Sequence, residues 1–108
     1  MKKVLFIGQY NILFQEISVF LTRFFNVQIC EGDMLSGSNL LAVSKPDVIL
    51  LDMLGMSEEK AEVFYELRTN CMDIPVVCLK TNEEEVTPEM IVGIKKFKTL
   101  KLPAGNER

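Results

Sequence analysis

The chain has 108 residues, of which 48% are hydrophobic and 25% are charged, and its formal net charge is −3. This length is common for one domain and too short to divide into two, so we expect a single domain over residues 1–108. The chain contains no histidine, which excludes Ser-His and Cys-His nucleophile pairs, histidine metal sites and a phosphohistidine. The negative charge gives no general electrostatic reason to bind nucleic acid.

The first apolar run, residues 4–7, predicts a short strand. The run stops at Gly8, and no small-residue cleavage site of an export signal follows it. No apolar stretch of the chain approaches the ~20 residues that a membrane-spanning helix needs. We therefore expect a cytoplasmic domain.

Residues 10–25 have the helical periodicity of an amphipathic helix. The residues expected on its inner face are Leu13, Ile17, Phe20, Leu21 and Phe24. Three further apolar residues, Phe14, Val19 and Phe25, are expected to be partial core, and some of them could form a dimer face. A short strand over residues 27–30 and a modest helix over residues 40–43 follow.

The segment at residues 48–52 is apolar until its last residue, Asp52, as expected of a central parallel strand that is buried on both faces. Ser57 and the two glutamates after it predict a helix start. The inner face of that helix is expected to contain Ala61, Phe64, Leu67 and Cys71. Residues 75–79 predict a second buried strand. Thr87-Pro88-Glu89 predicts the start of a helix, and we expect Met90, Ile91 and Ile94 to pack inward. Residues 97–102 predict a final strand.

Strands that alternate with helices indicate a doubly wound α/β domain with a five-stranded parallel sheet, for which we expect the strand order 2-1-3-4-5. Right-handed crossovers then place the first helix on one face of the sheet and the next three on the other. A fifth helix would share the face of the first. Its absence would leave apolar sheet surface exposed, from which we expect a chain truncated before its last helix, a swapped or dimeric partner, or a following segment.

Asp52 is the candidate functional residue. Doubly wound sheets bind ligands at the carboxyl ends of the strands where the strand order reverses, here between the first and third strands. Gly8, Gln9, Asp52 and Leu54 lie at those ends. A carboxylate held there can act as a nucleophile that accepts a phosphoryl group.

Residues 45–54, Lys-Pro-Asp-Val-Ile-Leu-Leu-Asp-Met-Leu, resemble the third-strand motif of the receiver domains of two-component response regulators. Residues 75–79 resemble the fourth strand of that family, and residues 3–7 resemble its first. The resemblance covers residues 2–103 and lacks the family's last helix. It implies a flavodoxin-like receiver fold, in which Asp52 corresponds to the aspartate that a histidine kinase phosphorylates.

The departures from the family pattern lie around Asp52. Gly8 and Gln9 stand where the family has an acidic pair that holds Mg²⁺, so we expect no metal site, or at most weak Mg²⁺ binding at Asp52. Lys80 replaces a family Thr or Ser, and Lys101 is separated from the following proline instead of adjacent to it.

These substitutions lead to a hypothesis in which Lys80 or Lys101 replaces the charge of the metal and forms an ion pair with Asp52. Such a pair would depress the pKa of the Asp52 carboxyl. The alternative is that Lys80 only extends into solvent from a strand end.

Three functions follow as hypotheses. The first is a degenerate, non-enzymatic receiver without a cofactor, a regulatory module that contacts an output domain, a histidine kinase or a second copy of itself. The second is a receiver that is phosphorylated at Asp52 in a phosphorelay, and the third is a flavodoxin-like small-molecule binder. The late lysines Lys95, Lys96, Lys98 and Lys101 are expected to protect a sheet edge rather than to bind nucleic acid.

Overall fold

The computed structural model describes residues 1–32, 40–54, 56, 60–70 and 73–102. Within these residues the strands are β1 (Lys3–Gly8), β2 (Asn26–Glu31), β3 (Val48–Asp52), β4 (Val76–Lys80) and β5 (Phe97–Lys101). They form one sheet in the order β2-β1-β3-β4-β5, and every neighbouring pair is parallel. The predicted strand order is therefore confirmed.

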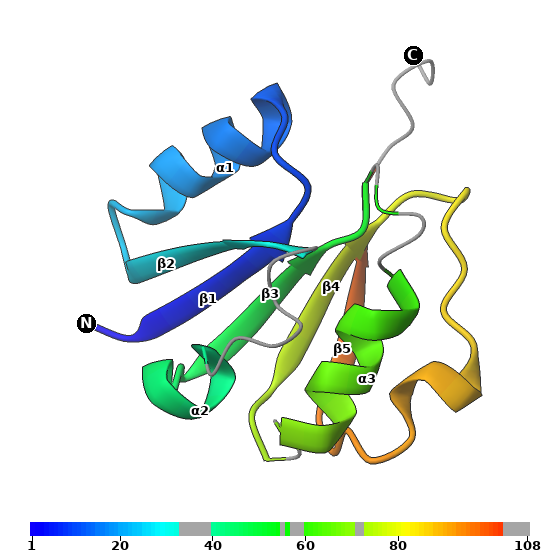
Figure 1. The fold of residues 1–108 in the computed structure, drawn as a ribbon. Helices are drawn as coiled ribbons and strands as arrows, with labels where there is room; N and C mark the ends of the chain where they lie inside the picture. Colours follow the sequence, from blue (N-terminus) through cyan, green and yellow to red (C-terminus); the bar gives the residue numbers. More distant parts are fainter. Residues whose placement is uncertain (33–39, 55, 57–59, 71–72, 103–108) are drawn as a thin grey trace.

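The described helices lie on both faces of this sheet (Figure 1). They are α1 (Ile12–Leu21), α2 (Leu40–Ser44), α3 (Lys60–Asn70) and the short 3-10 helix η2 (Pro88–Ile91). As the crossovers predict, α1 covers one face, while α2 and α3 cover the other. No described helix is long and apolar enough to cross a membrane.

The two faces of the sheet support separate hydrophobic clusters because side chains alternate along each strand. The larger cluster joins the sheet to α2 and α3, and it includes Leu5, Ile7, Ile49, Leu51, Leu41, Phe64 and Leu67. The smaller cluster joins the sheet to α1 and is built on Phe6, Phe14 and Leu79. On α3 the inward positions Phe64 and Leu67 are confirmed, whereas Val63 is buried and Ala61 is exposed. The predicted helix start at residues 57–59 and the inward position 71 lie outside the described residues.

The predicted inner face of α1 is confirmed in part. Ile17 and Leu21 pack against the smaller cluster, but the other three predicted inward residues are exposed. Phe14 is fully buried and stacks on Phe6, with ring centroids 4.2 Å apart, whereas Leu13, Phe20 and Phe24 are 43%, 56% and 56% exposed. Asn11 caps the helix by accepting the Phe14 N–H at 2.8 Å. Because apolar residues surround most of this helix, periodicity alone does not select the face that turns inward.

The helix predicted after Thr87 is reduced to the single 3-10 turn η2. Gly93 has a φ of +94°, a left-handed conformation that stops helical geometry and turns the chain toward β5. The inward packing of Met90, Ile91 and Ile94 is nevertheless confirmed. Arg68 donates a hydrogen bond to the carbonyl of Met90 at 3.0 Å, which ties this turn to α3.

Candidate functional site

Asp52 ends β3 in the centre of the sheet, where β3 lies between β1 and β4. The residue is 0% exposed. Its Oδ1 accepts a hydrogen bond from the backbone N–H of Leu54 at 2.9 Å. Its Oδ2 is buried and accepts no hydrogen bond from any described residue. Among the described residues, the side chain is therefore held from one side only, and its buried second oxygen has no hydrogen-bond partner.

Gly8 ends the neighbouring strand β1 directly beside Asp52. A Cβ atom at this position would lie 2.7 Å from Cε1 of Phe14 and 3.0 Å from Cβ of Asp52. These distances are shorter than ordinary carbon contacts, which lie at about 3.5–4.0 Å. The ring of Phe14 therefore occupies the space that a side chain at position 8 would need. The resemblance to receiver domains would place the first residue of an acidic pair at position 8, and the packing of α1 closes that position to a carboxylate side chain.

Gln9 and Leu54 complete the predicted lining of the site. Gln9 is exposed, and its backbone carbonyl accepts a hydrogen bond from the Asn11 side chain at 3.0 Å. Leu54 is half-buried and contributes the N–H that Asp52 accepts. Of the predicted site residues, Gly8 and Leu54 are thus in direct proximity to the Asp52 side chain.

Burial is the main influence on the charge of Asp52. Removal from water raises the pKa of the Asp52 carboxyl above its ordinary value. The hydrogen bond from Leu54 lowers the pKa and the negative charge of Glu84 raises it, but both effects are smaller than that of burial. An ion pair with Lys80 or Lys101 would lower this pKa, so the upward direction of the pKa shift argues against that hypothesis.

Neither candidate lysine forms an ion pair with Asp52. The ammonium group of Lys80 donates to the backbone carbonyl of Thr81 at 2.9 Å, and Lys101 lies opposite Lys80 on the exposed strand β5. Among the described residues, no ammonium group lies within ion-pair distance of the Asp52 carboxylate. The structure therefore gives no support to the ion-pair hypothesis and agrees with a Lys80 side chain that follows the strand end.

Glu84 and Thr81 form a part of this region that the prediction of the site missed. The backbone N–H and the hydroxyl of Thr81 both donate to the Glu84 carboxylate, with the hydroxyl 3.0 Å from Oε1. The charge of Glu84 acts on Asp52 although 32 positions in the sequence separate the two residues. The Thr-x-x-Glu spacing is typical of a capping box and could have indicated the local pairing, but not its closeness to Asp52.

The residues around Asp52 do not fit Mg²⁺. This ion requires near-octahedral oxygen coordination, usually with one or two carboxylates and several waters. Asp52 is buried, position 8 has no side chain, and no group of three or more potential acidic, cysteine or histidine ligands occurs in the described part of the chain. The carboxylate of Glu84 is already engaged by Thr81.

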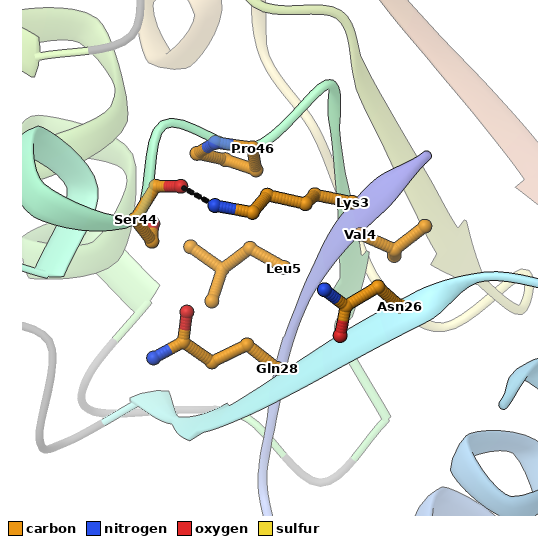
Figure 2. A pocket seen from close by; sticks show the side chains of 7 residues that line it. All are labelled: Lys3, Val4, Leu5, Asn26, Gln28, Ser44 and Pro46. Atoms are coloured by element: carbon orange, nitrogen blue, oxygen red, sulfur yellow. Dashed lines mark hydrogen bonds between the residues drawn. The ribbon is translucent and has the colours of Figure 1, made fainter. Parts of the chain in front are cut away.

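A small hollow lies at the amino-terminal ends of β1 and β2, away from the carboxyl ends of the strands where Asp52 lies (Figure 2). It is lined by Lys3, Val4, Leu5, Asn26, Gln28, Ser44 and Pro46. The ammonium group of Lys3 donates to the backbone carbonyl of Ser44 at 3.2 Å, and the buried Ser44 hydroxyl has no hydrogen-bond partner among the described residues. A polar hollow of this kind suits ordered water and is separate from the Asp52 site.

Solved structures with a fold similar to this chain include the following three. The first is an adenylate cyclase from Rhodopirellula baltica, with a TM-score of 0.69 and 21% identity over 93% of this chain and 75% of that one. The second is the N-terminal domain of a response regulator receiver protein from Methanoculleus marisnigri JR1, with a TM-score of 0.67 and 20% identity over 95% of this chain and 85% of that one. The third is the N-terminal domain of the nisin resistance regulator NsrR, a lantibiotic response regulator, with a TM-score of 0.64 and 16% identity over 94% of this chain and 86% of that one.

At the level of sequence, no model of a known protein family matches the chain, and no curated protein matches it. The structural similarities establish the fold. The chain has the flavodoxin-like fold of response-regulator receiver domains, and Asp52 ends the central strand β3.

Proposed function

We propose that this chain is a degenerate receiver domain, a non-enzymatic regulatory module of two-component signal transduction. It acts in the cytoplasm through contact with a protein partner, either an output domain or a histidine kinase. The observation that carries the proposal is the closed environment of Asp52, which is 0% exposed and lies beside a glycine position filled by the ring of Phe14.

Phosphoryl transfer to a carboxylate requires an accessible oxygen and positive charge around the phosphoryl group. Asp52 offers neither in the described structure, because its second oxygen is buried and no described cation pairs with it. Burial also raises the pKa of the carboxyl, which favours the protonated and non-nucleophilic form. The same fold can still present surfaces whose arrangement a partner recognises.

One observation favours a second candidate function, a receiver that is phosphorylated at Asp52 by a histidine kinase. The Oδ2 atom of Asp52 has no hydrogen-bond partner among the described residues, so a local opening of the site would leave it available as a nucleophile. This function requires Phe14 or the chain after Asp52 to move before phosphorylation.

Beryllium fluoride, a mimic of the phosphoryl group, separates the two functions. We expect no change in the amide NMR signals of Gly8, Gln9, Met53 and Leu54 when the domain is mixed with Mg²⁺ and beryllium fluoride. Asp52→Asn is the matched control, because it keeps the size of the side chain and removes the acceptor carboxylate. Shifts that occur in the natural sequence and vanish in Asp52→Asn would establish the phosphorylatable receiver instead, as would a stable phosphorylated species after incubation with acetyl phosphate.

A further inference from the structure

β2 forms one edge of the sheet, and its outer side has no partner strand among the described residues (Figure 1). The N–H of Asn26 donates to the carbonyl of Lys2 at 2.9 Å, so the backbone groups of Asn26 face β1. Because these groups alternate in direction along a strand, the N–H and C=O groups of Val27 and Ile29 point away from the sheet. No described residue forms a hydrogen bond with these outward groups. The edge therefore offers a row of donors and acceptors that suits an extended chain.

The two edges of the sheet differ in their protection against pairing. β5, the opposite edge, is five residues long and carries the exposed residues Lys98 and Lys101. Exposed lysines on an edge strand oppose edge-to-edge pairing, because pairing would remove their charges from water or bring like charges together. β2 is six residues long, contains neither lysine nor proline, and carries a charge only at its last residue, Glu31. By this criterion, β2 is the unprotected edge.

An apolar hollow of about 290 Å³ lies beside β2, on the face of the sheet that α1 covers. Its lining includes Ile29 from β2 and Tyr10, Val19 and Thr22 from α1 and its two ends, and no charged residue lines it. Ile29 is 50% exposed and Val19 is 58% exposed. A strand that pairs with β2 places every second side chain on this face. The hollow therefore favours a strand whose side chains on this face are apolar and uncharged.

The sequence of β2 is complementary to itself in one antiparallel register. With a two-fold axis at Gln28, Val27 of each copy lies opposite Ile29 of the other, and the two Gln28 side chains lie opposite each other. Val27 and Ile29 both have outward backbone groups, so each of these pairs exchanges two hydrogen bonds. Val27 of one copy then enters the hollow beside Ile29 of the other, and such β-branched cross-strand pairs stabilise a sheet.

A neighbouring register fits less well. If the axis moves by one residue to Ile29, Val27 of one copy lies opposite Glu31 of the other, which places a carboxylate beside an apolar side chain. In the register at Gln28, Glu31 lies beyond the paired residues and no like charges face each other. A two-fold interface requires a surface that is complementary to itself, so these pairings favour a second copy over a strand of unrelated sequence.

We propose that β2 pairs antiparallel with β2 of a second copy, so that the two five-stranded sheets join into one continuous sheet about a two-fold axis at Gln28. Three observations carry the proposal: the unpaired backbone groups of Val27 and Ile29, the absence of lysine from this edge, and the uncharged hollow beside Ile29. This dimer goes beyond the proposed regulatory function and does not depend on the chemistry of Asp52.

Sedimentation equilibrium of the whole chain tests the pairing. We expect dimers of the natural sequence at concentrations up to roughly 1 mM, the range of the weakest specific complexes. Ile29→Pro should weaken the dimer at least about tenfold, because it removes a donor from each of the two hydrogen-bonded pairs. Far-UV circular dichroism should show an intact fold, since an edge strand tolerates proline where the N–H faces solvent.

Lysine substitutions on the two edges provide a matched control. Ile29→Lys should weaken the dimer at least about tenfold, because it gives β2 the protection that β5 already has. Leu100→Lys makes the same kind of change on β5, at a position that is 55% exposed, and should leave the dimer unchanged.

Cysteine cross-linking locates the axis. The two Gln28 residues form a non-hydrogen-bonded pair, in which Cα atoms lie about 4.5 Å apart, within the range that a disulfide spans. On mild oxidation, Gln28→Cys should form an intermolecular disulfide between the introduced thiols, which peptide mapping identifies. Thr99→Cys, at an exposed position of β5, should not.

Three outcomes would overturn the proposal. A natural sequence that remains monomeric at the highest concentration would exclude a second copy as the occupant of the edge. A dimer that is indifferent to both Ile29→Pro and Ile29→Lys would place the interface elsewhere. Cross-linking of Thr99→Cys as fast as that of Gln28→Cys would show random collision instead of pairing through β2.

Discussion

The close contact between Gly8 and Phe14 allows a quantitative test of the site. In Gly8→Ala, the new methyl group would lie 2.7 Å and 2.9 Å from two carbons of the Phe14 ring and 3.0 Å from Cβ of Asp52. Phe14 is fully buried and stacked on Phe6, so the ring has little freedom to retreat. Overpacking of this kind costs about 1–3 kcal/mol.

Part of that cost is offset in the unfolded state. Replacing glycine by alanine reduces the conformational freedom of the unfolded chain, which stabilises the folded state by about 0.4–1 kcal/mol. The expected net loss in the free energy of unfolding is therefore on the order of 1–2 kcal/mol. At roughly 4–8 °C per kcal/mol for a domain of about 100 residues, this lowers the melting temperature by about 4–16 °C.

Thermal and urea unfolding, followed by far-UV circular dichroism, measure this loss. Phe14→Leu supplies the second half of a double-mutant cycle, because the smaller side chain vacates the space that the new methyl group needs. The double variant Gly8→Ala/Phe14→Leu should be more stable than the sum of the two single losses predicts, with a coupling of about 0.5–3 kcal/mol. If the two losses add, or if Gly8→Ala is neutral, then the Phe14 ring does not close position 8 and our account of the missing acidic residue is wrong.

Three further predictions concern the buried groups at the end of the sheet. Burial raises the pKa of the Asp52 carboxyl, so the free energy of unfolding should fall as the pH rises from 3.8 through the raised pKa, by about 1.4 kcal/mol per pKa unit. Asp52→Asn should flatten this pH dependence, as measured by urea unfolding. Lys80→Ala should leave the NMR titration of the Asp52 carboxyl unchanged, because the ammonium group donates to Thr81. Burial raises the pKa of the Cys78 thiol to about 12, so at pH 8 iodoacetamide should modify this residue only after the protein is unfolded.

Each of these predictions has an outcome that contradicts it. A natural sequence and an Asp52→Asn variant with the same pH dependence would show that the Asp52 carboxyl is not desolvated in the folded state. A shift of the Asp52 titration in Lys80→Ala would restore the ion-pair hypothesis. Alkylation of native Cys78 at the rate of a free thiol would show that the carboxyl end of β4 opens to solvent.

Sequence patterns predicted the sheet because its signals are local. Residues 48–52 and 75–79 are short apolar runs bounded by turn residues, as is typical of buried parallel strands. The position of Asp52 at the end of β3 follows from the same run. Given that order of elements, the handedness of the crossovers leaves few topologies, and the predicted order proved correct.

Only the tertiary structure decided which face of α1 turns inward and what surrounds Asp52. The helix is apolar on most sides, and it is Phe14 that packs against Gly8, whereas Leu13 and Phe20 are exposed. The pKa of Asp52 depends on burial by elements far away in the sequence and on the charge of Glu84, and no local pattern reports either effect. A sequence can therefore predict a carboxylate at a strand end. Whether that carboxylate is charged, and whether it is accessible to solvent, depends on packing between segments that are distant in the sequence.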